Sequence, residues 1–280
     1  MNRLRHRPLL ETRNANASRG RLLRESWGGL EKYLARHSFT VFLDFDGTLT
    51  RAHERPELAE LSEEMRGRLS RLATRVPVTI VSGRDRMDVA SLVGLPELTY
   101  AGCHGFDVEE SALPSMPKFK GAAMPVDVAA LGVSVQEAVS AVPGVVVKVK
   151  RWAVAIHYRT VRAEDVEGLE DAVMALVVAA PKFRASQGKK VIEIIPDIDW
   201  HKGRAVMWLA EIFTQRDGPA TPIYVGDDVT DEEAFNSLAG KGITVLVAKQ
   251  SRPTAADYRV DDPDEVGWFL DKLFALAPVT

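Results

Sequence analysis

The sequence predicts an α/β protein with a doubly wound parallel sheet and a smaller α+β module inserted into it. Short apolar runs recur along the chain, and segments of helical periodicity, such as 58–72 and 205–213, lie between several of them. Alternation of strands and helices is typical of a parallel sheet with helices on both faces. The runs that we expect to form this sheet are 40–45, 78–81, 99–102, 223–225 and 243–247.

The middle of the chain has a different pattern. Two β runs, 145–150 and 153–159, are separated by Arg151 and Trp152 alone, which indicates a hairpin. A helical stretch follows, and the run KKVIEIIP (189–196) then predicts a third strand that ends at a proline. Strands followed by a helix and another strand predict a compact α+β module.

The expected division of the chain has three parts. They are a basic N-terminal arm (1–37), a core (38–115 and 197–280) and the inserted module (116–196). The first 36 residues carry nine Lys or Arg against three acids. We expect this arm to be solvated and partly disordered, with a short helix near residues 22–35. Contact with an anionic partner such as nucleic acid is the alternative.

Composition narrows the class of protein. The 280 residues are 46 % hydrophobic with a net charge of −3, which is ordinary for a soluble globular chain. No apolar run approaches the roughly 18 residues that cross a membrane, and the first residues lack the apolar centre of a secretory signal. We therefore expect no membrane partner, and few aromatic residues in a mildly acidic remainder argue against nucleic acid. A single cysteine, Cys103, cannot form an internal disulfide, which favours a cytoplasmic location.

Two acids stand at the end of the first expected strand, in the run VFLDFDGTLT (41–50). Asp44 and Asp46 are two residues apart, so their side chains share one face of an extended strand. Buried carboxylates are costly without a partner, and ligands of parallel sheets bind beyond the carboxyl ends of the strands. These acids therefore predict a site at the sheet edge. The alternative is a turn that happens to carry acids.

Two further segments place phosphate-binding groups at such ends. Ser82 and Gly83 follow the second strand, where a hydroxyl and free backbone N–H groups suit a phosphate oxygen. Lys202 stands at a helix start, where a cation opposes the helix dipole and a nearby anion would explain it. An ordinary capping serine and a solvated lysine are the alternatives.

The run GDDVTD (226–231) supplies three acids within five residues, Asp227, Asp228 and Asp231. These carboxylates repel one another unless a cation lies among them. A donor set of oxygens alone favours a hard cation, Mg²⁺ above others. The alternative is an acidic helix start that the helix dipole stabilises.

In this order, DFDGT, the serine, the lysine and GDDVTD resemble the motifs of the haloacid dehalogenase (HAD) superfamily of phosphotransferases. The resemblance implies a HAD-like Rossmannoid core in which Asp44 is the nucleophile and Asp46 the general acid/base. It also implies that Ser82 and Lys202 hold the phosphate, beside the backbone N–H of Gly83. The Mg²⁺ ligands that it implies are Asp44, the main-chain carbonyl of Asp46, Asp227 and Asp231, with Asp228 left open.

A closer resemblance is to the trehalose-6-phosphate phosphatases. The segments that carry it are GDDVTDEEAF (226–235), YAGCHGFDVE (100–109), WAVAIHYR (152–159) and KKVIEIIP (189–196). It covers roughly residues 38–275 and implies hydrolysis of trehalose 6-phosphate through an aspartyl-phosphate, with the inserted module as a cap over the sugar. The sugar contacts that it implies are His104, Lys150, Arg159, Lys189 and Glu193.

Two departures from the family pattern keep other functions open. Arg51 and Ala52 follow the first motif where the family commonly has a proline and a branched apolar residue, and Asp107 stands where a glutamate is usual. A HAD phosphatase for another phosphorylated sugar, such as glucosylglycerol phosphate, is the first alternative. A phosphosugar-binding or regulatory subunit without activity is the second, although such a protein would be expected to lose Asp44 or the Asp227 cluster. In the strand 189–196, Lys189 and Glu193 share one face while Ile192 and Ile194 take the opposite face, so one face of the cap sheet is expected to be charged. This charged face could also be solvated only. The basic arm leaves room for contact with a sugar-phosphate synthase.

Overall fold

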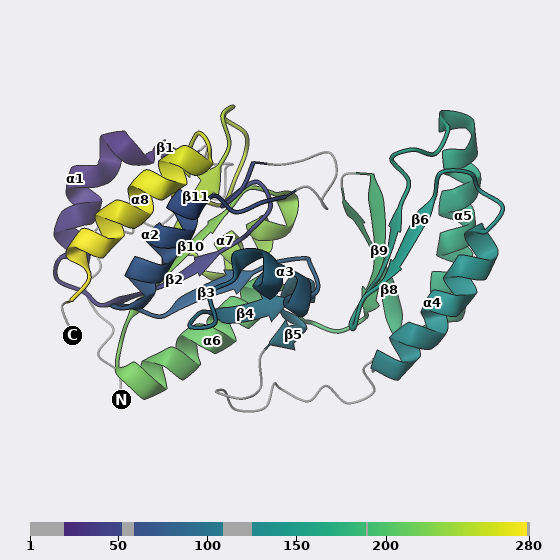
Figure 1. The fold of residues 1–280 in the computed structure, drawn as a ribbon, viewed down its shortest axis with the longest axis horizontal. Coiled ribbons are helices and arrows are strands. Elements are labelled where there is room, and N and C mark those ends of the chain that lie inside the picture. The colour runs from purple at the N-terminus through teal and green to yellow at the C-terminus, as the bar shows by residue number, and fades with distance from the viewer. Residues whose placement is uncertain (1–19, 52–58, 109–124, 189, 279–280) are drawn as a thin grey trace.

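The computed structural model describes residues 20–51, 59–108, 125–188 and 190–278. Within these ranges the strands form two separate sheets, one of eight strands and one of four (Figure 1). None of the described helices is long and apolar enough to cross a membrane.

The eight-stranded sheet is the predicted doubly wound sheet. Its strand order is β1-β12-β11-β10-β2-β3-β4-β5, and every neighbouring pair is parallel except β4 and β5. All five expected runs form strands of this sheet, and the short strands β1, β5 and β12 were not predicted. The strands are β1 (Arg21–Leu22), β2 (Phe39–Leu43), β3 (Val78–Val81), β4 (Thr99–Gly102), β5 (Asp107–Val108), β10 (Thr221–Gly226), β11 (Ile243–Val247) and β12 (Tyr258–Val260).

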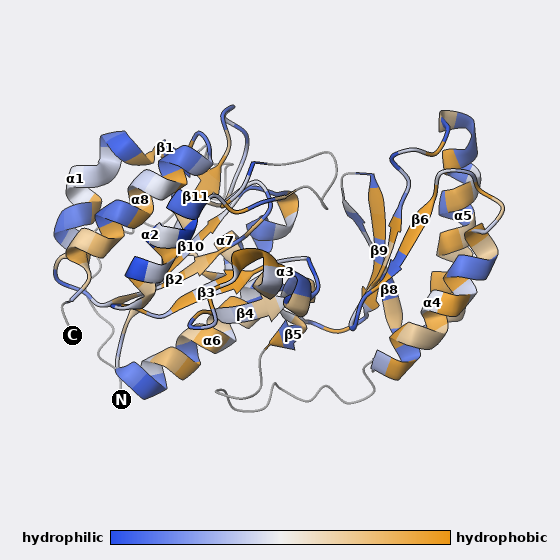
Figure 2. Cartoon of the chain, in the orientation of Figure 1, coloured by the Kyte–Doolittle hydropathy of each residue, from blue (hydrophilic) through white to orange (hydrophobic). Residues whose placement is uncertain are grey.

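Helices cover both faces of this sheet, with α1, α2, α3 and α8 on one face and α6 and α7 on the other. In β2, Val41 and Leu43 pack beneath the first group, while Phe42 packs beneath the second. Strand side chains alternate between faces, so a sheet covered on both sides needs an apolar residue at every position. Figure 2 shows the central strands β2, β3 and β10 as mostly hydrophobic. The helices are α1 (Leu23–Leu34), α2 (Glu63–Ala73), α3 (Arg86–Val93), α6 (Lys202–Asp217), α7 (Glu232–Ser237) and α8 (Pro263–Leu276), with the 3₁₀ turns η2 (Cys103–Gly105) and η3 (Val229–Asp231).

The four-stranded sheet forms the inserted module, which we call the cap (described residues between 125 and 196). Its antiparallel order is β6-β7-β9-β8, in which β6 and β7 form the predicted hairpin and β9 is the predicted third strand. Helices α4 and α5 pack on one face, and the other face is turned toward the large sheet (Figure 1). The strand β8 was missed because its run FRASQG has no continuous apolar stretch. The cap elements are α4 (Pro125–Val139), β6 (Val146–Val149), β7 (Val154–His157), α5 (Ala163–Ala179), β8 (Phe183–Gly188) and β9 (Val191–Pro196).

The structure differs from the expected arm at residues 21–34. These residues form β1, which pairs with β12, and the expected short helix α1, which packs into the main core. The buried positions Leu23, Trp27, Leu30 and Leu34 recur every three or four residues, so one face of α1 is apolar in spite of the basic charges around it. Residues 1–19 lie outside the described residues, as does the expected start of the cap at residue 116. The other domain boundaries stay predictions.

Candidate active site

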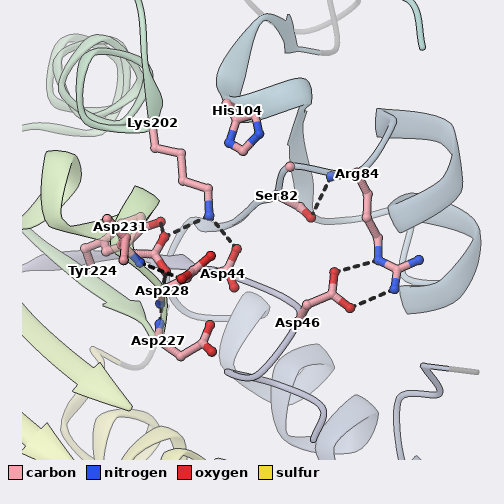
Figure 3. A network of polar contacts seen from close by, with 12 residues as sticks. Asp44, Asp46, Ser82, Arg84, His104, Lys202, Tyr224, Asp227, Asp228 and Asp231 are labelled. Atoms are coloured by element: carbon pink, nitrogen blue, oxygen red, sulfur yellow. Dashed lines mark hydrogen bonds and ion pairs between the residues drawn. The ribbon is translucent and has the colours of Figure 1, made fainter. Parts of the chain in front are cut away.

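The candidate site lies where the carboxyl ends of β2, β3 and β10 meet. The strand β2 pairs in parallel with β3 on one side and with β10 on the other. The residues that follow these strands, Asp44, Ser82 and Asp227, therefore reach one edge of the sheet, as the sequence predicted. Lys202 joins them from the first turn of α6 (Figure 3).

Three acids form a compact triad in this site: Asp44, Asp227 and Asp231. Each offers one carboxylate oxygen, and these atoms all lie within 4.8 Å of one another. Asp44 and Asp231 are buried, with exposed fractions of 4 % and 0 %. Gly47 permits the approach of Asp227, because a Cβ at this position would lie 2.1 Å from Oδ2 of Asp227, and its φ of +82° also favours glycine.

Four hydrogen bonds fix the carboxylate of Asp231 in place. Its Oδ1 accepts hydrogen bonds from Lys202 Nζ at 2.8 Å and from the Tyr224 hydroxyl at 2.6 Å. Its Oδ2 accepts the main-chain N–H groups of Asp227 and Asp228, both at 3.0 Å. Asp231 therefore fixes the loop after β10 as well as lying in the triad. The exposed Asp228 is not a member of the triad; its carboxylate accepts the N–H of Val229 at 2.7 Å and caps η3.

Lys202 is a buried positive charge that contacts two of the triad acids. Its ammonium donates to Asp44 Oδ1 at 2.7 Å and to Asp231 Oδ1 at 2.8 Å, and the residue is only 2 % exposed. Burial alone would lower the pKa of Lys202, but the carboxylates of Asp231 and Asp44 outweigh burial and hold that pKa above its usual value. The lysine is therefore charged, and the predicted alternative of a solvated side chain is wrong.

The negative charge of the three carboxylates is nevertheless larger than the single positive charge of Lys202 can balance. Burial, together with repulsion from Asp231 and Asp227, raises the pKa of Asp44 well above its usual value in spite of Lys202. Burial and repulsion by Asp231 raise the pKa of Asp227 to about 7. Of the three triad acids, only Asp231 has a lowered pKa, since Lys202 and the hydrogen bonds that Asp231 accepts overcome the effect of burial.

These residues fit a hard divalent cation. The donor set consists of oxygens alone, as Mg²⁺ prefers. The Oδ1 atom of Asp227 is buried and has no hydrogen-bond partner among the described residues, which is unusual for a carboxylate oxygen in a protein interior. A cation beside Asp44 and Asp227 would give that oxygen a partner and balance the charge.

Asp46 lies apart from the triad. Its carboxylate is turned toward Arg84, which binds it with two parallel contacts of 2.7 Å, Nε to Oδ2 and Nη2 to Oδ1 (Figure 3). The sequence was expected to gather four acids in one pocket, but the structure gathers three side chains and separates the fourth. The role predicted for the main-chain carbonyl of Asp46 stays a prediction. Sequence reasoning assigned no role to Arg84, although the run SGRD places it directly after the predicted phosphate-binding turn.

Ser82 and Gly83 form the turn between β3 and α3. The Ser82 hydroxyl is buried and accepts the main-chain N–H of Arg84 at 3.1 Å, as a capping serine would, and its own proton can still be donated. A Cβ on Gly83 would lie 2.8 Å from Cε1 of His104, so the small residue permits that ring to approach. The carbonyl of Gly83 accepts Lys150 Nζ from the cap at 2.8 Å.

Two of the predicted cap residues meet a predicted core residue at this turn. Glu193 from β9 accepts Lys150 Nζ at 2.5 Å through Oε1 and contacts His104 Nε2 at 2.7 Å through Oε2. Burial would raise the pKa of Glu193, but Lys150 and His104 lower it. Ile192 and Ile194 point to the opposite face and pack in the cap core, as the alternation of the strand predicted.

The other cap residues are not part of this cluster. Arg159 is exposed and follows β7 at the end opposite to the hairpin turn that carries Lys150. Lys189 lies outside the described residues. A contact that the sequence did not reveal joins Arg151 of that turn to the buried Asp107 of the core, with Nη1 and Oδ1 2.9 Å apart.

A family model described as trehalose-phosphatase matches residues 42–264. The chain belongs to the trehalose-phosphatase family. A curated relative from this group, the trehalose-phosphate phosphatase of Mycobacterium tuberculosis (strain ATCC 25618 / H37Rv), is 36 % identical over 258 residues, which cover 88 % of this chain and 63 % of the relative. This trehalose-phosphatase chain therefore spans less than two thirds of the length of that relative. The predicted family is confirmed.

Solved structures confirm the HAD-like fold of this trehalose-phosphatase chain. The C-terminal domain of the Candida albicans trehalose-6-phosphate phosphatase aligns with a TM-score of 0.75 at 22 % identity, covering 94 % of this chain and all of that one. The C-terminal domain of the Candida albicans trehalose synthase regulatory protein aligns with a TM-score of 0.67 at 14 % identity, covering 88 % of this chain and 97 % of that one. At these identities the likeness concerns the fold alone, and the site must decide between catalysis and regulation.

Proposed function

We propose that this protein is a phosphomonoester hydrolase that converts trehalose 6-phosphate to trehalose and phosphate. The observation that carries the proposal is the triad of Asp44, Asp227 and Asp231 around Lys202, at the sheet edge where ligands of parallel sheets bind. The substrate class follows from the family and from the names of its curated relatives.

Magnesium is the metal that this site suits. Asp44 and Asp227 would hold it with the main-chain carbonyl of Asp46, and Asp231 would support them from behind. When bound, the ion supplies charge that neutralises the phosphoryl oxygens. This chain's own contribution is the rigid frame that keeps the carboxylates close, with Gly47 and Tyr224 as parts of it.

Asp44 is the nucleophile of the proposed reaction. Its carboxylate attacks phosphorus, a bond forms between that oxygen and phosphorus, and the bond from phosphorus to the sugar oxygen breaks. Asp46 donates a proton to the departing sugar oxygen, so that an alcohol leaves instead of an alkoxide. Asp46 then accepts a proton from the water that attacks the aspartyl-phosphate, which releases phosphate and restores Asp44.

Lys202 and the turn after β3 hold the phosphate during both steps. The ammonium of Lys202 lies 2.7 Å from Asp44 Oδ1 and can bind a phosphoryl oxygen while that carboxylate attacks. Ser82 contributes its hydroxyl proton, and Gly83 its main-chain N–H. Preorganised donors of this kind need no rearrangement when charge develops.

The cap recognises the sugar in this proposal. Glu193, Lys150 and His104 lie together between the cap and the core, where these partly buried polar groups can bind sugar hydroxyls. Arg159 and Lys189 stay predicted contacts. Closure of the cap over the sheet edge would exclude water from phosphoryl transfer.

Two alternatives differ from this proposal in substrate or in activity. Asp107, an aspartate where a glutamate is usual, pairs with Arg151 between core and cap, so a different phosphorylated sugar such as glucosylglycerol phosphate remains an alternative. The fold is also shared with a regulatory protein. Retention of the contact between Asp44 and Lys202, with Asp227 in the same triad, favours an enzyme over a regulatory subunit.

The test is phosphate release from a panel of sugar phosphates, with and without added magnesium. We expect trehalose 6-phosphate to be hydrolysed fastest and EDTA to abolish the reaction. Faster turnover of glucosylglycerol phosphate would overturn the substrate, and absence of turnover on every ester, with tight binding of a sugar phosphate, would favour the regulatory alternative.

A further inference from the structure

The arginine beside the predicted acid/base is anchored more firmly than a surface residue. The side chain of Arg84 is 11 % exposed and forms a planar fork with both oxygens of Asp46. A third nitrogen, Nη1, donates to Asp88 Oδ2 at 3.1 Å, one helical turn further along α3. The guanidinium carbon also lies 5.5 Å from the centre of the Phe45 ring, which favours a cation.

The main chain of Arg84 is fixed as well. Its N–H donates to Ser82 Oγ at 3.1 Å, and its carbonyl accepts the N–H of Cys103 at 2.7 Å. The fork is therefore held in place before Asp46 meets it. A bidentate contact of arginine with a carboxylate fixes orientation as well as distance.

The contact between Arg84 and Asp46 directs Asp46 away from Asp44, although the two acids are only two residues apart in the sequence. Asp44 belongs to the triad, whereas Asp46 is directed to the other side of the site (Figure 3). An acid/base must reach the leaving oxygen of the ester, and a carboxylate engaged in a cation site cannot serve that oxygen. Without an anchor, the half-exposed Asp46 could turn toward the same cation site as its neighbours.

We propose that Arg84 is a positioning residue that keeps the Asp46 carboxylate out of the acid triad and reserves it for proton transfer to the leaving group. The inference rests on the proposed function. It adds Arg84 to the site, a residue that the sequence did not predict and that is not a member of the triad. The Arg84 side chain binds Asp46, so its loss affects the step that needs a proton donor.

The first test compares two leaving groups in single-turnover experiments with Arg84→Met, which keeps much of the chain length and removes the fork. Trehalose 6-phosphate needs a proton at its departing oxygen, whereas p-nitrophenyl phosphate releases a stable phenolate. Misplacement of a general acid costs on the order of 10- to 100-fold. We expect a loss of this size in the first-step rate on the sugar ester, a change within about threefold on the aryl ester, and an almost unchanged KM for the sugar ester.

A double-mutant cycle distinguishes positioning from structural damage. In an Asp46→Asn background, Arg84→Met should change the sugar-ester rate by less than about twofold, because the group that it positions is already gone. Arg86→Met is the matched control: this arginine, the first residue of α3, faces Asp107 at 3.6 Å, so its loss should keep the ratio of the two first-step rates. If Arg84→Met does not fold, Asp88→Asn removes the support of the fork and should give a smaller loss with the same leaving-group dependence.

Equal losses on both esters, a rise in KM alone, or full additivity in the cycle would overturn the role of Arg84. Failure of the proposed function gives a different result. If the wild-type protein hydrolyses another sugar phosphate, that ester replaces trehalose 6-phosphate in the comparison with the aryl ester. For a wild-type protein inactive on every ester, crystal structures of wild type and Arg84→Met decide, since an Asp46 carboxylate that keeps its position without the fork would refute the proposal.

Discussion

Replacing Lys202 by methionine tests the charge balance of the site most directly. The lysine contacts Asp44 and Asp231 at 2.7 and 2.8 Å, and its side chain is 3 % exposed. Removing one partner of a buried ion pair leaves an uncompensated charge and typically costs about 3 to 5 kcal/mol of the free energy of unfolding. We expect a loss of this size for Lys202→Met at pH 8 in EDTA, measured by urea denaturation with tryptophan fluorescence.

The pH dependence of that loss has a definite sign. Without Lys202 the pKa of Asp44 in the folded protein rises further above its unfolded value, and the pKa of Asp231, which Lys202 holds below its usual value, rises as well. The folded state then binds more protons than the unfolded state, so stability falls as the pH rises from about 4 through the folded pKa values. The destabilisation by Lys202→Met should therefore be smaller at pH 5 than at pH 8. Wild type should show a weaker slope of the same sign from Asp227, whose pKa is about 7.

A surface ion pair supplies the matched control. Lys182 lies 3.2 Å from Asp127 with half of its side chain exposed, so Lys182→Met should cost at most about 1 kcal/mol. The reasoning is refuted if Lys202→Met is no more destabilising than Lys182→Met, or if its loss does not depend on pH. Either result would mean that Lys202 is not the cation on which the acids depend.

Three further outcomes follow from the site. Asp44→Asn should abolish phosphate release, because an amide is no nucleophile here, while circular dichroism shows an unchanged fold; substantial residual activity would remove Asp44 from its role. Gly47→Ala should raise the magnesium concentration needed for half-maximal activity, since its Cβ would push Asp227 out of the triad. Gly240→Ala is its control, because Gly240 also has a positive φ (+70°) but has nothing within 4 Å of a Cβ; equal metal dependence in the two variants would contradict the steric argument. Glu193→Ala should impair trehalose 6-phosphate about 10-fold or more and p-nitrophenyl phosphate far less; equal losses would show that Glu193 is not a sugar contact.

The core fold could be predicted because its strands are buried on both faces. Every residue of β2 and of β11 is buried, so these strands stand out as apolar runs. The edge strand β1 has only two residues, and β8 is polar along half of its length, so neither leaves such a signal. The helix α1 was expected, but the basic charges before residue 37 concealed its packing into the core, because its apolar positions are spaced by a helical period and do not form a run.

The meeting of several candidate residues at one sheet edge could be predicted, but their contacts could not. Strand order brings Asp44, Ser82 and Asp227 to one edge, and this follows from the doubly wound topology. The partner of each acid depends on side-chain directions across segments far apart in the chain. The sequence distance between Asp46 and Arg84 is 38 residues, and that between Asp44 and Lys202 is 158, so no local pattern could pair them.

Two cations, Lys202 and Arg84, hold the acids of this site in two different environments. Lys202 approaches from α6 and draws Asp44 and Asp231 together, while Arg84 approaches from the opposite side and draws Asp46 away (Figure 3). Asp44 and Asp46 are only two residues apart on one chain segment, so their different environments cannot come from β2 itself. A nucleophile needs an ionised carboxylate beside positive charge, whereas an acid/base needs a carboxyl free of the metal and close to the leaving oxygen. In the proposed reaction, one lysine and one arginine placed in this way would meet both needs, and exchanging their positions would leave the same acids without either function.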